Sequence, residues 1–454
     1  MVKTMLRKDF AEKVLRFGES KGLKDMEIFY DSSRELSIKS YQGKIDNFSV
    51  SNSEGVSFRA LHNNKMGYAY TEKVDDSSIP FLVEEAMQNA AIIDSDDNEN
   101  IYIGVDEYKK IDNYNLDLDQ VTEEQKIQLA LDLENEASCL DERIQSIQYC
   151  VYGDVAGETN IVNSKGLSLS SKSNIAFAYV GVVAKNGDDI KTGMAYKATN
   201  DFLKINPKEI AREAVEEAIS MLGAESVQSG NYPIILRNNA ACDLLESFSD
   251  VFSAENVQKD LSLLKAKIGQ TIACSDLNII DNPHMKDGFA SNPFDGEGYP
   301  TQIKKVVENG ILKTYLHNLK TSEKDGVSST GNASRSSYKS TIGISPSNFF
   351  IENGTYTMED MVKSIDKGLL LIELQGLHSG LNSVSGDFSL SCYGYLIEKG
   401  KISKPVNQIT VSGNFFKMIK NIEMIGNDLK FGLPAGSYFG APSLKINELS
   451  IAGK

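Results

Sequence analysis

Short segments rich in β-branched and aromatic residues alternate with turn signals between Met26 and Tyr70, and no other feature of the chain limits its fold as strongly. Four polar or glycine-containing turn signals divide this stretch: Asp31-Ser32-Ser33, Gln42-Gly43-Lys44, Ser53-Glu54-Gly55 and His62-Asn63-Asn64. Strand-like segments separated by such short turns are typical of β-hairpins. The pattern therefore predicts an antiparallel meander.

Helical patterns lie on both sides of the predicted meander. Asp9 and Glu12 resemble a capping box, and apolar residues then follow at helical spacing until Gly22 offers a stop. Further helices are expected over three stretches: 78–91, 122–140 and 207–222. The last of these has the clearest boundaries, because Asn206-Pro207 precedes it and Gly223 follows it.

The remaining segments are richer in strands. Residues 144–198 should be mostly β, with turns at four glycines: Gly153, Gly157, Gly166 and Gly187. Apolar spacing then predicts a helix pair, the first carrying the stripe from Leu244 to Phe252 and the second starting near Ser253 with Leu261 and Leu264 facing inward. Helices and antiparallel-looking strands thus mix without a steady βαβ rhythm, so the predicted fold class is α+β.

The chain is long enough, at 454 residues, for two or three domains. The stretch Glu225–Asn231 is short, polar and contains a glycine, so we place the main boundary there. Residues 1–225 are expected to form an N-terminal α+β domain with a helix and the meander. Residues 226–454 are expected to form a predominantly β C-terminal domain with the helix pair.

The charge balance limits the partners, since 63 acidic residues against 47 basic ones give a net charge of −16. Lys and Arg are scattered among Asp and Glu, so no basic patch offsets the repulsion of a phosphate backbone or an anionic lipid surface. We therefore expect neither direct nucleic-acid binding nor a membrane partner.

Apolar runs and cysteines indicate the compartment. The strongest apolar run, Leu369–Ile372, is far shorter than the roughly 20 residues of a membrane span. No apolar segment of a signal peptide follows the basic residues near the N-terminus. The five cysteines are widely spaced and form no C-x-x-C, which argues against a disulfide framework and a thiolate metal cluster. A cytoplasmic protein is the resulting expectation.

Several common catalytic motifs are missing from the sequence. There is no G-x-x-x-x-G-K-[ST] phosphate loop, no G-x-S-x-G nucleophile elbow and no H-E-x-x-H zinc helix. The four histidines never occur at the i, i+4 spacing that places two imidazoles on one helical face. A zinc site assembled from distant histidines stays open, but structural histidines are the favoured interpretation.

Glycine-punctuated polar segments in the second half remain as candidates for function. They are Phe294-Asp295-Gly296-Glu297-Gly298-Tyr299-Pro300-Thr301, Ser329-Thr330-Gly331-Asn332-Ala333-Ser334-Arg335, and Gly376-Leu377-His378-Ser379-Gly380-Leu381-Asn382 continuing to Gly386-Asp387-Phe388-Ser389. They either close tight hairpins and hydrogen-bond their own backbone, or they line a peptide-binding cleft. His378 and Asp387 could form an acid–base pair, although no nucleophile completes it.

The same segments, with Gly394-Tyr395-Leu396-Ile397-Glu398-Lys399-Gly400 and Val411-Ser412-Gly413-Asn414, resemble the signatures of the TldD/PmbA family and of its TldE/PmbA branch. The resemblance covers nearly the whole chain. It implies a two-domain α+β protein that forms dimers enclosing a cavity. In this family a TldD-type chain carries zinc on an H-E-x-x-x-H helix together with a cysteine near the C-terminus, and a TldE-type chain pairs with it. Members are linked to the processing of small peptides and to modulation of DNA gyrase.

This sequence departs from the TldD pattern at every expected ligand. Aligned on Leu244-Leu245, the motif positions hold Glu246, Ser247 and Val251, and the C-terminal cysteine position falls within Phe431–Leu433. The resemblance therefore implies no metal and no catalytic residue in this chain. Zinc is expected in the partner subunit.

The resulting hypothesis is a metal-free subunit of a heterodimeric zinc metallopeptidase that acts on unfolded peptides and helps to form the substrate cavity. His378, Ser379, Asn382 and Asp387 are the residues predicted to line or shape that cavity. The expected partners are a TldD-type paralogue and unfolded peptides, with the chain in a homo- or heterodimer. Two alternatives stay open: a stand-alone homodimeric peptide-binding module, and a hydrolase with an unrecognised site near His378.

Overall fold

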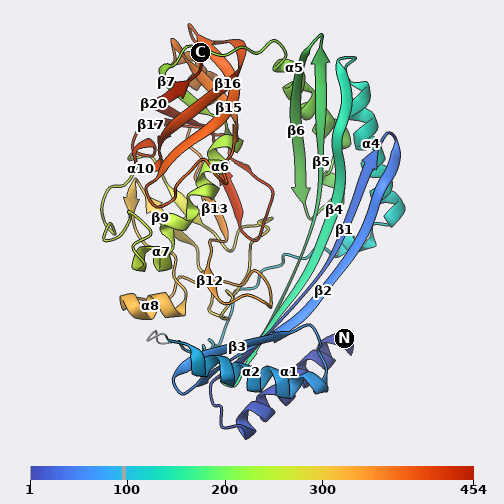
Figure 1. Cartoon of the computed structure of the whole chain (residues 1–454), viewed down its shortest axis with the longest axis vertical. Coiled ribbons are helices and arrows are strands. Elements are labelled where there is room, and N and C mark those ends of the chain that lie inside the picture. The colour runs from blue at the N-terminus through green and yellow to red at the C-terminus, as the bar shows by residue number, and fades with distance from the viewer. Residues whose placement is uncertain (1, 95–98) are drawn as a thin grey trace.

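The computed structural model describes residues 2–94 and 99–454, and within them the strands form three six-stranded sheets and one two-stranded sheet. Helices pack against the outside of the first sheet and between the other two (Figure 1). This confirms the predicted α+β class.

The first sheet contains the predicted meander and has the strand order β3-β2-β1-β4-β5-β6 with every neighbouring pair antiparallel. Its strands are β1 (Met26–Tyr41), β2 (Lys44–His62), β3 (Lys65–Thr71), β4 (Ile144–Asn163), β5 (Ser168–Asn186) and β6 (Asp189–Thr199). Two of the predicted turns are confirmed at Gln42-Gly43 and at Asn63-Asn64, where all four residues have positive φ. Asn and Gly tolerate that conformation, and the tight hairpins require it.

Other predicted turns lie inside strands. Asp31-Ser32-Ser33 pairs directly with Ser53-Glu54-Gly55 in the middle of the β1–β2 ladder, and Gly153 and Gly157 lie within β4. These predictions were wrong because the strands are about twice as long as expected and their central parts carry polar residues that are exposed or only partly buried. Gly153 is a packing position instead, since a Cβ there would lie 2.4 Å from the Phe177 ring.

Helices cover the outer face of the first sheet at its two ends (Figure 1). At one end α1 (Val2–Ser20) and α2 (Ile79–Ile92) enclose a core around Phe58. At the other end α4 (Glu123–Cys139) and α5 (Pro207–Ser220) enclose a core around Leu36 and Ile38. Shorter helical turns are η1 (Asp76–Ser78), α3 (Leu116–Gln120) and η2 (Phe202–Lys204).

The predicted caps on these helices are partly confirmed. Asn206 caps α5 and Pro207 is its first residue, as predicted. Thr122 forms a capping box with Gln125 at the start of α4, a cap that was not predicted from the sequence. The expected start at Asp9 is wrong, because α1 already begins at Val2 and Asp9 lies inside it.

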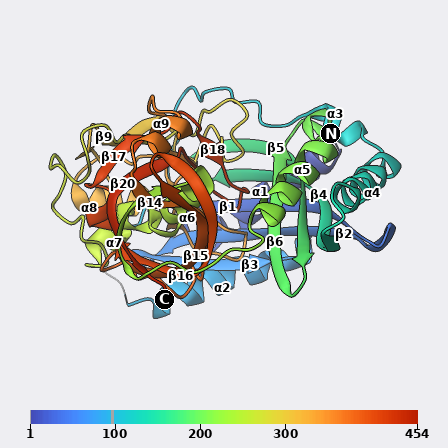
Figure 2. The ribbon, with the colours of Figure 1, turned by 90° about the horizontal axis from the view of Figure 1, so that it is seen from above.

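The second sheet has the order β16-β15-β14-β7-β20-β17, and β16 also pairs with β20, so the sheet curls back on itself (Figure 2). Its strands are β7 (Gly230–Leu236), β14 (Lys367–Gln375), β15 (Asp387–Glu398), β16 (Lys401–Asn414), β17 (Ile422–Ile425) and β20 (Leu444–Ala452). Only one neighbouring pair in this order, β7 with β14, is parallel.

The third sheet has the order β10-β9-β8-β13-β19-β18, and a separate two-stranded sheet joins β11 to β12. The bounds are β8 (Ile279–Asp281), β9 (Lys304–Glu308), β10 (Ile311–Leu312), β13 (Asn348–Ile351), β18 (Lys430–Phe431), β19 (Tyr438–Ala441), β11 (Ala333–Ser334) and β12 (Gly343–Ile344). The helices of this half are α6 (Asn238–Ser247), η3 (Ser249–Phe252), α7 (Ala254–Gln258), α8 (Leu319–Asp325), α9 (Met358–Lys363) and α10 (Phe415–Met418). Helix α6 contacts β14 of the second sheet and β18 and β19 of the third.

The predicted helix pair is only partly correct. The apolar stripe from Leu244 to Phe252 is fully buried, but the helix breaks at Phe248 and continues as the 3-10 turn η3. The second helix is short, and Leu261 beyond it is 45% exposed rather than inward-facing, whereas Leu264 is buried. Apolar spacing predicted burial well because α and 3-10 turns place nearly the same residues on one face.

No helix of the described residues is long and apolar enough to cross a membrane.

Candidate functional site

A cleft of about 620 Å³ lies between the first sheet and the C-terminal half of the chain. One wall comes from β4, β6 and α5, including Tyr149 and residues 192–196 of β6. The other wall comes from the start of α6 and from β14 and β15, including Glu373 and Tyr393. Because β6 is the last strand of its sheet, one of its backbone edges is not taken up by a strand of that sheet.

Arg237 connects the two walls. Its guanidinium donates to the Glu217 carboxylate of α5 at 2.7 Å and to the backbone carbonyl of Ile372 at 3.1 Å. Its Nε donates to the side-chain oxygen of Asn239 at 2.6 Å. A second link across the cleft is the hydrogen bond between the Ser220 and Tyr395 hydroxyls, 2.6 Å apart. These bonds fix the width of the cleft.

Two carboxyl groups in and beside the cleft have raised pKa values, which favours their neutral forms. Burial raises the pKa of Glu373, and the nearby carboxylates of Asp243 and Glu217 also raise it. The cation of Arg237 has a smaller, opposite effect, and the resulting pKa is about 7. Burial and the charge of Glu246 likewise raise the pKa of Asp243 to about 6. Desolvation and like charges both disfavour a carboxylate. The cleft therefore contains groups that change charge close to neutral pH.

Helix α6 and the segment after β18 bring together the positions to which the resemblance assigns zinc ligands. A Cβ on Gly432 would lie 3.6 Å from the Cys242 sulfur, and the Tyr196 hydroxyl donates to the Phe431 carbonyl at 3.2 Å. At the end of α6, Ser247 donates to the Asp243 carbonyl at 2.7 Å, and Val251 in the following 3-10 turn η3 is fully buried in the core.

These side chains do not fit a zinc ion. Zinc sites in proteins use imidazole, thiolate and carboxylate donors, and the assigned positions supply one carboxylate, a hydroxyl and an alkyl group. Burial raises the pKa of the neighbouring Cys242 thiol to about 12, so it stays protonated. Over residues 2–94 and 99–454 no group of three or more His, Cys, Asp or Glu side chains is placed to hold a metal ion.

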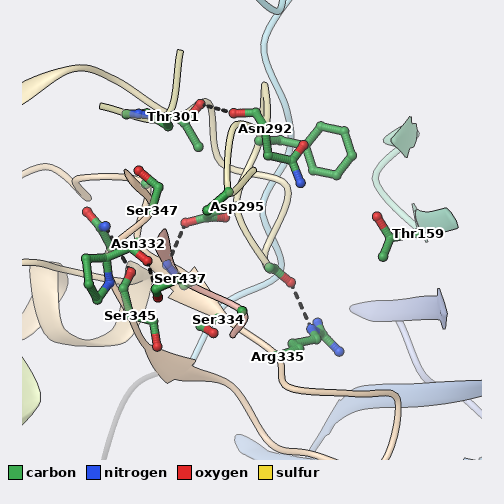
Figure 3. Close-up of a pocket in the computed structure, with 18 of the residues that line it drawn as sticks. Thr159, Asn292, Asp295, Thr301, Asn332, Ser334, Arg335, Ser345, Ser347 and Ser437 are labelled. Carbon is green, nitrogen blue, oxygen red and sulfur yellow. Dashed lines mark hydrogen bonds between the residues drawn. The ribbon is translucent and has the colours of Figure 1, made fainter. Parts of the chain in front are cut away.

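A second hollow of about 190 Å³ is lined by two of the glycine-punctuated segments and by β1 and β4 (Figure 3). Asp295 joins the two segments, because its carboxylate accepts from the backbone N–H groups of Glu297 and Tyr299 at 2.9 and 3.0 Å and from that of Ala333 at 3.0 Å. Gly331 has φ +70°, and a Cβ there would lie 2.9 Å from the Pro300 carbonyl oxygen. Glycine is therefore required where the segments cross.

A buried charge network ties this hollow to the first sheet. Arg59 donates to the two Glu27 oxygens at 2.8 and 3.1 Å and contacts Glu297 at 3.4 Å. Arg335 pairs with Glu27, donates to the Gly296 carbonyl at 2.8 Å and lies over the ring of Phe29. All four charged side chains are at most 4% exposed. We call Glu27, Arg59, Glu297 and Arg335 the buried clamp.

The segments of the second hollow are therefore chiefly structural. The buried clamp joins them to β1 and β2, and burial raises the pKa of both Asp295, to about 8, and Glu297. One polar atom in the hollow could still accept a hydrogen bond: the side-chain oxygen of Asn292 is buried and has no hydrogen-bond partner among the described residues.

The four predicted site residues lie elsewhere: three are on the connection between β14 and β15, and Asp387 is the first residue of β15. His378, Ser379, Asn382 and Asp387 are all exposed and line neither hollow. The Asn382 side chain accepts from the N–H groups of Val384 and Ser385 at 3.0 and 3.1 Å. These bonds are local turn contacts.

The four residues come together only in part. The Asn382 N–H donates to the Asp387 carbonyl at 2.8 Å. Asn414 donates to the Asp387 carboxylate at 2.8 Å, and this bond, with that of Ser385, lowers the pKa of Asp387. The His378–Asp387 acid–base pair, which the sequence left open, does not form a hydrogen bond among the described residues. A role for the four residues in a cavity stays a prediction.

Two cleft residues that sequence reasoning missed carried recognisable signals. Glu373 interrupts the apolar run Leu369–Leu374 inside a central strand, where an ionisable group is costly unless it has a function or a partner. Arg237 directly follows strand β7 and precedes α6, at a strand-to-helix junction. The tyrosines of the cleft gave no such signal, because aromatic residues are common in strands.

Comparison with known proteins matches most of the chain to one protein family. The family models for the PmbA/TldA metallopeptidase domain 1, central domain and C-terminal domain match residues 26–90, 116–222 and 229–453. A candidate modulator of a DNA gyrase from Thermotoga maritima shares 33% identity with a TM-score of 0.90, covering 98% of this chain and 100% of that one. Metalloprotease PmbA of Escherichia coli O157:H7 is 26% identical over 97% of this chain and 94% of its own length.

A further solved structure supports the fold alone. TldE from Thermococcus kodakarensis is 22% identical and superimposes with a TM-score of 0.89 over 98% of this chain and 100% of that one. With matches to all three family models in order and near-complete coverage of a relative above 30% identity, the chain belongs to the PmbA/TldD family of metallopeptidase-like proteins.

Proposed function

We propose that this chain is the metal-free subunit of a two-subunit zinc metallopeptidase and contributes one part of the cavity that receives unfolded peptides. The observation that carries the proposal is the chemistry of the side chains on α6 and the following turn η3. In a domain that matches a metallopeptidase family model, the three motif positions hold Glu246, Ser247 and the buried Val251. A metallopeptidase needs a Lewis acid that polarises the carbonyl and activates water. This donor set does not provide one, so the zinc belongs to a TldD-type partner.

The cleft between the sheet and the C-terminal half supplies what a peptide-holding subunit needs. Its volume of about 620 Å³ and the edge of β6 at residues 192–196 suit a short extended segment. Backbone groups of an edge strand bind an extended peptide regardless of its sequence, and the side chains of Tyr149 and Tyr393 add flat contact surface. The chain would therefore hold many unfolded substrates with little sequence selectivity.

The proposed complex resides in the cytoplasm. All five cysteines are free thiols, three of them buried. Free, buried cysteines without disulfides are typical of a reducing compartment.

The test compares the purified chain, a purified TldD-type paralogue and their mixture. Zinc is measured by plasma mass spectrometry, and hydrolysis of an unfolded polypeptide is followed with and without a chelator. We expect stoichiometric zinc in the paralogue and the complex, none in this chain, and chelator-sensitive turnover only where the paralogue is present. Stoichiometric zinc or chelator-sensitive hydrolysis in this chain alone would overturn the proposal.

A second candidate function has one observation in its favour. Both walls of the cleft come from a single chain, so peptide binding requires no partner residue. The alternative is a stand-alone homodimeric peptide-binding module. Binding of a fluorescent unfolded peptide by the isolated chain, unchanged when the paralogue is added and without hydrolysis in the mixture, would favour it over the subunit role.

A further inference from the structure

The cleft between the first sheet and the C-terminal half carries more acidic than basic side chains. Four glutamates and two basic residues line it: Glu213, Glu216, Glu217, Glu373, Arg237 and Lys430. Arg237 pairs with Glu217 at 2.7 Å, and Lys430 lies 3.6 Å from Glu213. Glu216 and Glu373 have no ion-pair partner among the described residues. Two carboxyl groups of the cleft are therefore left for a cation that the chain itself does not supply.

Glu373 is the less exposed of these two carboxyl groups. It is partly buried on β14, whereas Glu216 is exposed on α5. Among the described residues its side chain receives one long hydrogen bond, at 3.4 Å, from Asn239 Nδ2, and the same nitrogen donates to the Ile372 carbonyl at 2.8 Å. A carboxylate that is partly removed from water needs stronger partners than this. Glu373 can therefore gain from a positively charged ligand.

Tyrosine side chains flank Glu373 from both walls of the cleft. Tyr393 lies directly opposite Glu373 on β15, and opposite residues of an antiparallel pair project from the same face. Tyr149 belongs to β4 on the other wall, and burial, the neighbouring Tyr179 and the charge of Glu373 all raise the pKa of its phenol. The effect of Glu373 requires that the two side chains lie near each other. Aromatic rings attract ammonium groups, so a cation at Glu373 would be favoured by its surroundings as well.

The chain already holds one lysine of its own in this way within the cleft. Lys430 Nζ lies 5.5 Å from the centre of the Tyr196 ring and 3.6 Å from the Glu213 carboxylate. A carboxylate and a tyrosine thus receive an ammonium group at one place in the cleft. Glu373 with its two tyrosines repeats this combination without a lysine among the described residues.

We propose that Glu373, with Tyr149 and Tyr393, binds the ammonium group of a lysine side chain on the peptide in the cleft. The inference rests on the proposed peptide-holding function and adds one side-chain preference to it. A peptide on the edge of β6 would lie on the wall opposite Glu373. The flexible four-carbon stem of lysine can reach across along aromatic surface, whereas the terminal amine of a peptide has no stem. Backbone pairing leaves the other peptide positions unselected.

The groups around Glu373 give this binding a measurable signature. Asp243 and Glu217 raise the pKa of Glu373, Arg237 lowers it, and with burial the value is about 7. An ammonium group beside the carboxyl favours its ionised form, so binding displaces the proton. At pH 7 about half of the Glu373 side chains carry a proton, and a bound lysine should therefore release about half a proton per peptide.

The experiment compares two peptides on the full chain and on its complex with a TldD-type paralogue. Each peptide is short, acetylated, amidated and uncharged except at one central residue, which is lysine in one and norleucine in the other. Norleucine keeps the carbon stem without the ammonium group. Fluorescence anisotropy at pH 8, where Glu373 is mostly ionised, should show about tenfold tighter binding of the lysine peptide. Calorimetry at pH 7 in two buffers of different ionisation enthalpy should detect the released proton with the lysine peptide alone.

Two variants and a third peptide assign the effect. Glu373→Gln should bind the lysine and norleucine peptides with equal affinity and release no proton. Glu216→Gln is the matched control, because it removes an exposed carboxylate from the same cleft, and it should keep most of the preference. A norleucine peptide with a free N-terminus shows whether a terminal amine can take the place of the lysine.

Equal affinities of the lysine and norleucine peptides for the wild-type chain would overturn this inference and leave the proposed function standing, because peptides would still be held. A preference that survives Glu373→Gln, or that Glu216→Gln removes to the same extent, would attribute it to the acidic surface as a whole and reject the site. Tighter binding of the free-amine peptide than of the lysine peptide would reject the lysine side chain as the ligand. If no peptide bound to the chain or to the complex, the proposed function would fail together with the inference.

Discussion

Arg237 Nη2 lies 2.7 Å from Glu217 Oε2, and this ion pair joins helix α5 to the start of the C-terminal half. Glu217 is 11% exposed and Arg237 is 32% exposed, so the pair is partly desolvated. The same guanidinium also holds Asn239 and the Ile372 carbonyl. One guanidinium thus contacts both walls of the cleft.

We predict that Arg237→Ala destabilises the protein and loosens the cleft. The change removes the cation paired with the partly buried Glu217 carboxylate, which keeps a 3.5 Å contact with the Tyr393 hydroxyl, and one of the two side-chain donors to the Ile372 carbonyl, the other being Asn239. This loss costs on the order of 2 kcal/mol of unfolding free energy. Urea denaturation measures the loss. Lys430→Ala is the matched control, because its contact with Glu213 is long, at 3.6 Å, and both side chains are about half exposed. It should cost well under about 1 kcal/mol, and an equal loss in both variants would contradict the shared-cation role.

We predict that Glu373→Gln makes the protein more stable at alkaline pH. The pKa of Glu373 in the folded chain, about 7, lies above the usual value of 4.5. The folded state therefore binds more protons than the unfolded chain between these pH values, and the unfolding free energy falls as pH rises through that window. Glutamine keeps the shape without the charge. The variant should exceed the wild type by about 1–3 kcal/mol at pH 8 and match it near pH 4.

Urea unfolding of both proteins across this pH range is the measurement. Glu216→Gln, an exposed carboxylate on the same cleft, is the matched control. A stability difference between wild type and Glu373→Gln that does not change with pH would show that the buried charge is not the cause.

Local patterns predicted the elements of the fold wherever one face of an element is buried. Asn63-Asn64 marked a tight hairpin, and Pro207 and Gly223 marked the ends of α5, because these residues have backbone preferences that do not depend on tertiary context. The turn predictions failed at Ser32 and Glu54, which resemble turn residues but lie in long strands that are partly exposed to solvent. Polar residues in a strand that is exposed on a face cannot be distinguished from a turn without knowledge of the pairing.

The candidate site was less predictable for a related reason. Arg237 and Glu217 are 20 residues apart in the chain, and Glu373 comes from a strand more than 100 residues further on. Their meeting depends on how the first sheet packs against the C-terminal half, which no local pattern encodes. The polar loop at His378 attracted the prediction because its composition is distinctive. In the structure its Asn382 accepts from a neighbouring turn residue, and the Asp387 carboxylate accepts from Asn414 at the end of β16.

We predict that Arg59→Met is strongly destabilising. The change leaves two carboxylates of the buried clamp, Glu27 and Glu297, without the cation that contacts both. Removing one partner of a buried ion pair lowers the unfolding free energy by about 3–5 kcal/mol. The melting temperature measures the loss. Hydrogen exchange should also accelerate in the segments around Asp295 and Ala333, which the clamp ties to the first sheet.

Glu72→Gln provides the comparison for Arg59→Met. Its contact with Lys339 also joins the residue that follows β3 to the C-terminal half, but both side chains are at least half exposed. It should change the melting temperature little. If Arg59→Met melted as the wild type does, the buried clamp would not be what holds the two halves together.

We predict that replacing both His378 and Asn382 by alanine lowers peptide turnover by the reconstituted complex, if the loop between β14 and β15 shapes the shared cavity. Loss of the Asn382 side chain also removes two hydrogen bonds that close the turn, at 3.0 and 3.1 Å, so a stability effect of about 1 kcal/mol is expected as well. The variant His378→Ala with Asn382→Asp keeps an acceptor for both N–H groups and separates the two effects. Turnover is measured on an unfolded polypeptide with saturating TldD-type partner, alongside the melting temperature of the complex. A double-alanine variant with unchanged turnover and unchanged stability would remove the loop from the cavity, and the cleft at Arg237 and Glu373 would be left as the peptide-holding surface of this chain.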